Sequence, residues 1–149
     1  MTYDKASVKT AIKRKSLSLP AKWLNDKGLI KGAALDYGCG LGADAFLIGM
    51  DNYDPNYFPR RPIKKYDTIT CTYVLNVLHP DDVPYVVDDI AKYLAPDGTA
   101  YIAVRRDIKK EGRTSIGTQQ WNVRLPLPIL VEKKSRFCIY KLINTTETK

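Results

Sequence analysis

The residues best suited to chemistry form one short stretch: Asp36 followed by three alternating glycines, Gly38, Gly40 and Gly42. An apolar run ends in this aspartate, as expected of a buried strand that leads into a turn. Glycine accepts positive φ and has no Cβ, so a ligand can approach the backbone of such a turn closely. A helix that begins at the turn would point its free N–H groups at that ligand.

The spacing of these glycines separates two kinds of binding site. Phosphate-binding dinucleotide folds use G-x-G-x-x-G, whereas the spacing here is G-x-G-x-G, with Asp36 two residues before the first glycine. A carboxylate at that position would repel a pyrophosphate and could pair with an ammonium group. The motif alone leaves open an ordinary glycine-rich turn between a strand and a helix.

The elements that must position this turn are strands alternating with helices. A helix follows Ser18, has Pro20 in its first turn and ends at Gly28. The clearest helix spans residues 82–94, where apolar side chains recur with helical spacing. Strands are predicted at residues 33–37, 50–53, 68–72 and 99–104, with a short helix at 43–48. Residues 95–98 have the signature of a type I turn, and residues 105–120 are expected to form a polar, mobile loop.

This alternation predicts an α/β fold with a mostly parallel, doubly wound sheet and a ligand at the strand ends. Residues 121–125 and 137–142 are predicted to close the sheet as an antiparallel strand pair. The length of 149 residues fits one domain. We divide it into a basic, helical N-terminal segment (1–31), a cofactor-binding core (33–104) and the C-terminal strand pair (121–142).

Residues 34–42 resemble motif I of the class I S-adenosylmethionine-dependent methyltransferases, whose sheet is Rossmann-like. Residues 66–78 are similar to the fourth-strand motif of that family, and residues 94–98 to the turn before its fifth strand. The resemblance implies that Asp36 lies near the cofactor's amino group and that Asp54 accepts hydrogen bonds from both ribose hydroxyls. The cofactor-binding residues that it implies are Asp36, Gly38, Cys39, Gly40, Gly42, Asp54, Pro55 and Thr72.

A closer resemblance covers residues 14–20, 35–40, 53–55 and 73–77, which are similar to small methyltransferase-like proteins of phages and bacterial DNA-modification clusters. The chain also departs from the family pattern. Between Asp54 and Asp67 there is no space for the usual third strand and its helix, so we expect a compact sheet with a reduced third-strand region. The acidic residue that often follows the third strand, near the adenine, has no counterpart. Asp51 takes the ribose role from Asp54 if the strand register differs.

The methyl acceptor is expected beside the strand that ends at Thr72. The Asp-Pro-Pro-Tyr or Asn-Pro-Pro-Tyr tetrad of many enzymes that methylate exocyclic amines of DNA bases is absent there. Cys71 has apolar flanks and is expected to pack in the core. The candidate catalytic residues, which would contact or deprotonate the acceptor, are Tyr73, Asn76 and His79. Packing for Tyr73, helix capping for Asn76 and a loop or cap role for His79 remain alternatives.

The charge distribution bears on partners and location. The net charge is +8, and basic residues gather before and after the predicted core. This favours a polyanionic partner such as DNA or RNA, contacted through Lys13, Arg14, Arg105 and Arg106. Basic side chains that only face solvent would give the same charge distribution, so that alternative stays open. One histidine and three cysteines without a Cys-x-x-Cys pair predict no metal site. The absence of a long apolar run predicts no membrane partner, and cysteines in core segments indicate a cytoplasmic protein.

We therefore predict a methyltransferase that uses S-adenosylmethionine, leaves S-adenosylhomocysteine as product, and methylates a nucleic acid. Two alternatives stay open: an inactive module that only binds the cofactor, and a methyltransferase that acts on a small molecule or a protein. A sulfonium is already an activated methyl donor, so positioning supplies much of the rate. The lack of an obvious catalytic triad therefore does not argue against an enzyme.

Overall fold

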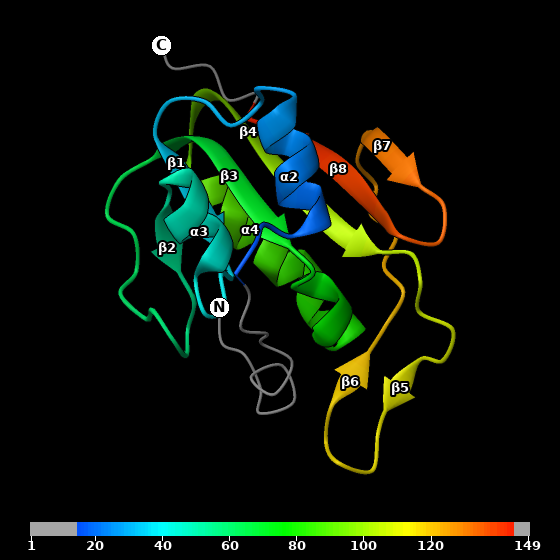
Figure 1. The fold of residues 1–149 in the computed structure, drawn as a ribbon. Helices are drawn as coiled ribbons and strands as arrows, with labels where there is room; N and C mark the ends of the chain where they lie inside the picture. Colours follow the sequence, from blue (N-terminus) through cyan, green and yellow to red (C-terminus); the bar gives the residue numbers. More distant parts are fainter. Residues whose placement is uncertain (1–14, 145–149) are drawn as a thin grey trace.

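The fold is built on one six-stranded sheet. The computed structural model describes residues 15–144, and the strands of this sheet lie in the order β2-β1-β3-β4-β8-β7 (Figure 1). Their bounds are β1 (Ala34–Tyr37), β2 (Asp51–Tyr53), β3 (Tyr66–Thr72), β4 (Leu94–Arg105), β7 (Ile129–Lys133) and β8 (Phe137–Ile143). Strands β1 to β4 pair in parallel, while β8 runs antiparallel to both β4 and β7. The predicted α/β sheet with an antiparallel C-terminal pair is confirmed.

Helices cover both faces of the sheet. Figure 1 shows α2 (Leu19–Asp26) and α3 (Ala43–Ile48) in front of the sheet and α4 (Val83–Lys92) behind it. Leu24 of α2 belongs to a buried cluster with Tyr101 of β4, whereas Ile90 of α4 belongs to a second cluster with Ile102. Successive residues of a strand point to opposite faces, so β4 is apolar on both sides. Two 3₁₀ turns, η1 (Leu75–Val77) and η2 (Pro80–Asp82), connect β3 to α4.

The third-strand region is reduced, as predicted. From the end of β2 to the start of β3 the chain forms neither a helix nor a strand of the sheet, and its one regular pairing is an isolated bridge between Asp54 and Phe58. We call residues 54–65 the replacement segment. Strand β2 is consequently an edge strand of the sheet.

The position of the closing strand pair differs from the prediction. Its first strand is Ile129–Lys133 rather than residues 121–125. The backbone of residues 121–125 makes other hydrogen bonds: the N–H of Trp121 donates to the carbonyl of Asn76, and the carbonyl of Val123 accepts from Arg106. Pro128 lacks an N–H group, and the strand begins directly after it.

Two loops are also more regular than expected. Residues 95–98 form a bulge inside β4, because Leu94 pairs with Tyr66 but Thr99 already pairs with Thr68. The bulge includes Asp97 at a φ of 63°. Within residues 105–120 a small hairpin forms from β5 (Gly112–Arg113) and β6 (Gln119–Gln120). The N-terminal helix is present as α2, while residues 1–14 of the predicted basic segment lie outside the described residues.

The start of α2 is fastened to the start of α3. The Ser18 hydroxyl accepts the N–H of Ala21 at 3.3 Å, which caps α2. The same hydroxyl donates to Asp44 at 2.7 Å, and the Ser18 N–H donates to the other oxygen of that carboxylate at 2.9 Å. Asp44 lies in the first turn of α3, where negative charge is favoured, and it is 2% exposed. Helix α3 follows the glycine turn directly, so this contact helps to fix the turn.

We expect Ser18→Ala to lower the free energy of unfolding by about 1–3 kcal/mol, because it removes a helix cap and one hydrogen bond to the buried Asp44 carboxylate. Urea denaturation measures this change. The control is Ser16→Ala, which alters an exposed serine two residues away. Equal stability of the two variants would contradict the role given to Ser18.

Candidate active site

The glycine turn lies where β1 ends, and its glycines are required by geometry. Gly38, Gly40 and Gly42 have φ values of 75°, 57° and 86°, in the left-handed region that L side chains rarely adopt. The N–H groups of Gly38 and Cys39 donate to the carbonyl of Tyr53 at 2.7 and 3.0 Å. The turn is therefore bound to the end of β2, which brings the carboxyl ends of two parallel strands together.

Asp54 binds this turn directly through its carboxylate. One oxygen accepts the N–H of Gly40 at 2.9 Å, and the other accepts the N–H groups of Asn56 and Tyr57 at 2.9 and 3.2 Å. A carboxylate has about four lone-pair positions, so these bonds leave about one for a ligand. The side chain is 2% exposed, and Pro55 follows it, partly buried.

Asp36 and Asp54 both act on Cys39, the residue between the first two glycines. Asp36 is 3% exposed and accepts a hydrogen bond from Thr70 at 3.1 Å. Burial raises the pKa of the Cys39 thiol well above its usual range, and the negative charges of Asp36 and then Asp54 raise it further. The turn thus carries a thiol that stays protonated, and the negative charge of Asp36 and Asp54 near it favours a cationic ligand.

The end of β3 shows two unusual features beside this turn. The buried hydroxyl oxygen of Thr72 has no hydrogen-bond partner among the described residues. The next residue, Tyr73, has a φ of 61°, although its N–H still donates to the carbonyl of Ala103 at 2.9 Å. A bulky residue with positive φ is an outlier, and such strain concentrates at functional sites. Both features lie where a ligand of an open α/β sheet binds.

Asn76 lies in the interior behind this strand end, at 0% exposure. Its amide nitrogen donates to the carbonyl of Trp121 at 2.8 Å, and its amide oxygen accepts the N–H of Arg105 at 2.7 Å. The side chain therefore joins η1, the end of β4 and the segment after β6. It holds other residues of the site in place.

His79 lies at the entrance to η2 and caps it. Its Nδ1 accepts the N–H of Asp81 at 3.1 Å, and its ring lies edge-on to the Trp121 ring with centroids 5.8 Å apart. The same Nδ1 lies 3.5 Å from an oxygen of the Asp81 carboxylate. About half of the side chain is exposed.

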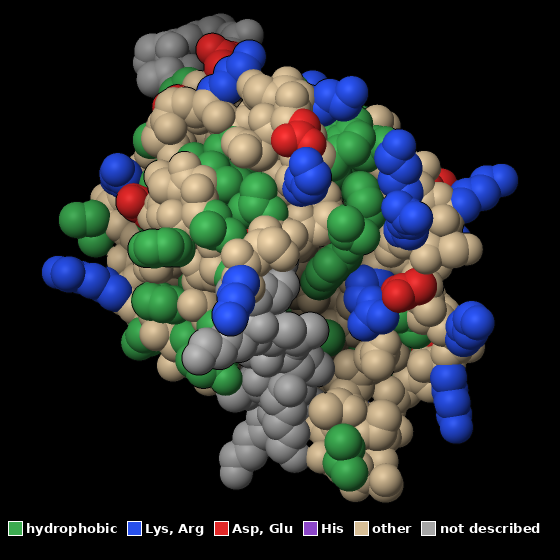
Figure 2. All heavy atoms as spheres, in the orientation of Figure 1, with side chains coloured by type: hydrophobic (Ala, Val, Ile, Leu, Met, Phe, Trp, Pro, Cys, Tyr) green, Lys and Arg blue, Asp and Glu red, His purple; other side chains and the backbone are tan. Residues whose placement is uncertain are grey.

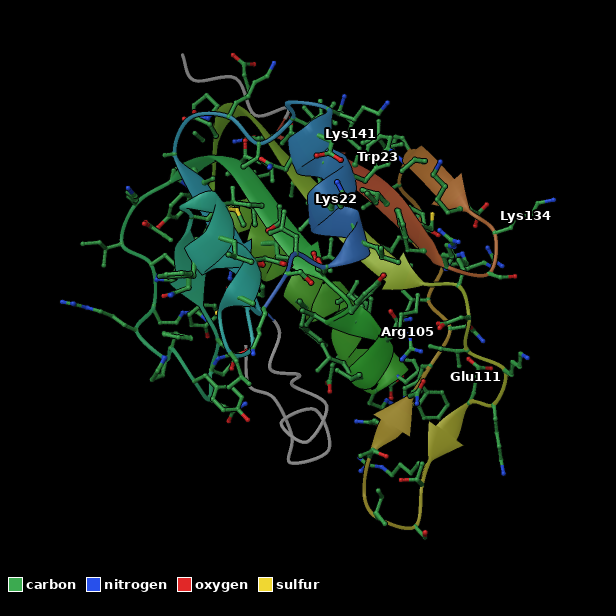
Figure 3. The ribbon with its side chains drawn as sticks, viewed as in Figure 1. Lys22, Trp23, Arg105, Glu111, Lys134 and Lys141 are labelled. Atoms are coloured by element: carbon green, nitrogen blue, oxygen red, sulfur yellow. The ribbon has the colours of Figure 1, made fainter. Side chains whose placement is uncertain are left out.

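Arg105 and Arg106, the two described residues of the predicted nucleic-acid contact, are both engaged within the protein. Arg105 forms two hydrogen bonds to the Asp107 carboxylate at 2.8 and 2.9 Å, and Figure 3 shows it where β4 ends, near the β5–β6 hairpin. The Arg106 side chain is 8% exposed and donates to Glu132 and to the Tyr140 hydroxyl, both at 2.8 Å. Lys13 and Arg14 lie outside the described residues.

Asp51 occupies the other end of β2. It pairs with Leu35, and its carboxylate accepts the Tyr66 hydroxyl at 2.7 Å. It lines an open groove of about 860 Å³ along the β2 edge, together with residues of the replacement segment. The described lining of this groove includes neither Asp36, Asp54 nor Thr72, so it is distinct from the site at the glycine turn.

Sequence reasoning missed Trp121 as part of this site. Residues 121–125 are expected only as a strand, and no local pattern signals that the Trp121 backbone bonds to Asn76 in both directions. Within residues 15–144 no cluster of His, Cys, Asp or Glu could hold a metal ion. No described helix has the length and apolar character needed to cross a membrane.

We expect Cys39 to react slowly with a disulfide reagent at pH 8 in the native protein, because the thiolate is the nucleophile and a raised pKa keeps this thiol protonated. Absorbance of the released thiolate measures the rate, and urea should expose all three cysteines. Asp54→Asn removes one of the negative charges and should accelerate the native reaction. A fast native reaction that disappears in Cys39→Ser would contradict this account.

Comparison with known protein structures supports the fold. DhpI in complex with S-adenosylhomocysteine has a TM-score of 0.56 at 16% identity, over 82% of this chain and 81% of that chain. The N-methyltransferase NodS from Bradyrhizobium japonicum WM9 has a TM-score of 0.53 at 14% identity, over 85% and 86%. The magnesium protoporphyrin IX methyltransferase ChlM from Synechocystis PCC 6803 has a TM-score of 0.54 at 11% identity, over 85% and 80%.

Not every structural match is of full length. The chain spans 47% of the amino pentose methyltransferase CalS10 from Micromonospora echinaspora. A search of curated protein sequences found no match. These comparisons lend no support to the resemblance to phage and DNA-modification proteins.

A sequence model of methyltransferase domains matches residues 11–128, which is most of the chain. The glycine turn, its two carboxylates and the four parallel strands β1 to β4 lie within that range. The chain therefore belongs to the methyltransferase-domain family.

Proposed function

We propose that this domain transfers the methyl group of S-adenosylmethionine to a nucleophilic atom of a small molecule. The observation that carries the cofactor's placement is the left-handed glycine turn with Asp36 and Asp54 beside it. S-adenosylmethionine, when bound, supplies an electrophilic methyl group on a sulfonium. The protein then has to bind, orient and exclude water, which positioned side chains do without acid–base catalysis.

The residues at the turn fit this cofactor. Asp36 offers a nearly buried carboxylate to the ammonium group, and a charge-assisted hydrogen bond there is strong. Asp54 has about one lone-pair position left, so we assign it one ribose hydroxyl rather than the two that the family resemblance implies. Thr72 offers a buried hydroxyl without a partner among the described residues. We assign Pro55 to the same ribose end, because it follows Asp54.

On the acceptor side we assign contact to Tyr73 and support to Asn76. Tyr73 follows Thr72 in a strained conformation and is half-buried, with its side chain packed against the buried cluster that contains Leu24 and Tyr101, and its exposed part is what we assign to the acceptor. Asn76 fixes Trp121 and Arg105, which line the same end. His79 has its Nδ1 occupied by the N–H of Asp81, so we assign it the role of orienting the acceptor.

Two observations favour a small molecule over a nucleic acid. The Arg106 side chain is 8% exposed and bound to Glu132, which removes it from the expected phosphate contact, and the Arg105 guanidinium is paired with Asp107 at the surface. Among the similar structures, ChlM is a magnesium protoporphyrin IX methyltransferase, and magnesium protoporphyrin IX is a small molecule.

A nucleic acid is the second candidate, and charge supports it. The net charge is +8, and Figure 2 shows Lys and Arg side chains along the side of this face where β7 and β8 lie. Figure 3 shows Lys134 extending away from the turn between these two strands. Lys109, Lys110 and Lys133 are also exposed. Binding through such residues would weaken steeply with salt because counterions are released.

Purified protein, methyl-labelled S-adenosylmethionine and four separate acceptor pools test the proposal: a small-molecule extract, DNA, RNA and lysate protein. We expect label in the small-molecule pool, and less label with Asp36→Asn at a cofactor concentration close to the dissociation constant of the native protein. Label in DNA or RNA that disappears with Lys109→Glu/Lys110→Glu would replace the proposal by the second candidate. Cofactor binding without transfer to any pool would identify an inactive module.

We expect Asp36→Asn and Asp54→Asn each to weaken binding of S-adenosylhomocysteine by about 1–3 kcal/mol, the range for hydrogen bonds to a charged group. Asp51→Asn is the matched control, because Asp51 lies at the far end of β2 and should leave the affinity unchanged. Isothermal titration calorimetry measures all three. A larger effect of Asp51→Asn than of Asp54→Asn would mean that the ribose binds at Asp51, which would contradict the assignment to Asp54.

A further inference from the structure

The replacement segment has little regular structure to hold it. Its one regular pairing joins Asp54 to Phe58, at its beginning. Pro59 and Pro62 lack N–H groups and cannot donate to the exposed edge of β2. Side-chain contacts must therefore fix the second half of the segment, which matters because Asp54 is its first residue.

Lys65 donates to the carbonyl of Lys92 at 2.7 Å and Lys64 lies 3.5 Å from Asp51. Arg61 makes the contacts that lead toward the glycine turn. One end of its guanidinium donates to the Tyr53 hydroxyl at 2.9 Å, and the other donates to Asp89 of α4 at 2.8 Å. The same group lies 5.2 Å from the centroid of the Tyr53 ring and 5.5 Å from that of Tyr93, within the range of cation–π contacts. The fixed fork of an arginine suits such a pair of acceptors, whereas a lysine offers a point charge.

The other oxygen of Asp89 accepts the hydroxyl of Tyr37. Burial acts to raise the pKa of Asp89, but hydrogen bonds from Tyr37 and Arg61 outweigh it and hold the pKa below the usual value. The carboxylate is therefore ionised at neutral pH. Tyr37 and Tyr53 are 0% and 2% exposed, and their ring centroids are 5.3 Å apart. Tyr37, Tyr53, Asp89 and Arg61 therefore form one connected network of contacts, which we call the clamp. Arg61 is its member at the surface.

The clamp reaches the glycine turn through the backbone. Tyr37 is the residue immediately before Gly38, and Tyr53 is the residue immediately before Asp54. The Tyr53 carbonyl accepts the N–H groups of Gly38 and Cys39. The two tyrosines that Arg61 and Asp89 hold by their hydroxyls thus carry the backbone on which the turn is built.

We propose that Arg61 is a positioning residue for the cofactor: it ties the replacement segment to Tyr53 and α4, and so holds Asp54 and the glycine turn in their binding geometry. Arg61 acts through Tyr53 and Asp54 rather than by touching the ligand. This rests on the proposed function, because the turn must bind S-adenosylmethionine for its geometry to matter.

The test compares Arg61→Met with Arg60→Met, which alters an exposed neighbour that makes no hydrogen bond or ion pair with the described residues. We expect Arg61→Met to weaken binding of S-adenosylhomocysteine about tenfold, measured by calorimetry. Amide exchange at Gly38 and Gly40 should accelerate, which reports on the turn itself. Arg60→Met should change neither quantity.

Further variants separate positioning from general stability. Tyr53→Phe removes one hydroxyl from the clamp and should weaken binding about threefold; it keeps the proposal testable if Arg61→Met fails to fold. Arg61→Lys restores the charge beside Asp89 and should recover part of the affinity. In Asp89→Asn, a further Arg61→Met change should have a smaller effect on affinity than in the native protein, because the pair acts together.

The possible failures are distinguishable. If the native protein binds the cofactor and Arg61→Met binds equally well, with unchanged exchange at Gly38 and Gly40, the positioning role is overturned and the cofactor assignment stands. If Arg61→Met and Arg60→Met weaken binding equally, the effect is one of surface charge, which also overturns it. If the native protein binds neither S-adenosylmethionine nor S-adenosylhomocysteine, the proposed function fails and the role of Arg61 fails with it.

Discussion

One carbonyl oxygen, that of Tyr53, accepts hydrogen bonds from two successive N–H groups of the glycine turn, and the site depends on this arrangement. It follows from the parallel register of β1 and β2, which pairs Tyr37 with Tyr53 and brings both strand ends to the same edge. A chain that donates twice to one acceptor must turn sharply, and the left-handed glycines allow this. The turn then places its N–H at Gly40 within reach of Asp54.

The parts of the fold that could be predicted are those encoded locally. The turn at Gly38 was recognisable because glycine spacing and the preceding aspartate are properties of a few adjacent residues. Helix α4 was predicted at residues 82–94 and spans Val83–Lys92, because its apolar periodicity is a property of a single segment. The reduced third-strand region was a matter of chain length, since too few residues separate Asp54 from Asp67.

The parts that could not be predicted depend on partners distant in sequence. Asn76 meets Trp121 across 45 residues, and Arg61 meets Asp89 across 28, so neither pairing leaves a local pattern. Arg106 shows the same limit. From the sequence it is expected to be an exposed cation, but in the fold its side chain is nearly buried, because Glu132 of β7 and Tyr140 of β8 accept its hydrogen bonds. Net charge describes a composition, whereas the charge available to a partner depends on which cations are already paired.

The edge position of β2 has a consequence for self-association. An exposed edge strand offers unpaired N–H and carbonyl groups to the sheet of another molecule, and long apolar edges lead to aggregation. Strand β2 has only three residues and begins with the charged Asp51, and the prolines of the replacement segment lie beyond it. The opposite edge, β7, ends in the exposed charges of Glu132 and Lys133. A methyltransferase sheet can therefore lose its third strand without gaining an edge that promotes aggregation, provided that the new edge strand is short, charged and followed by proline.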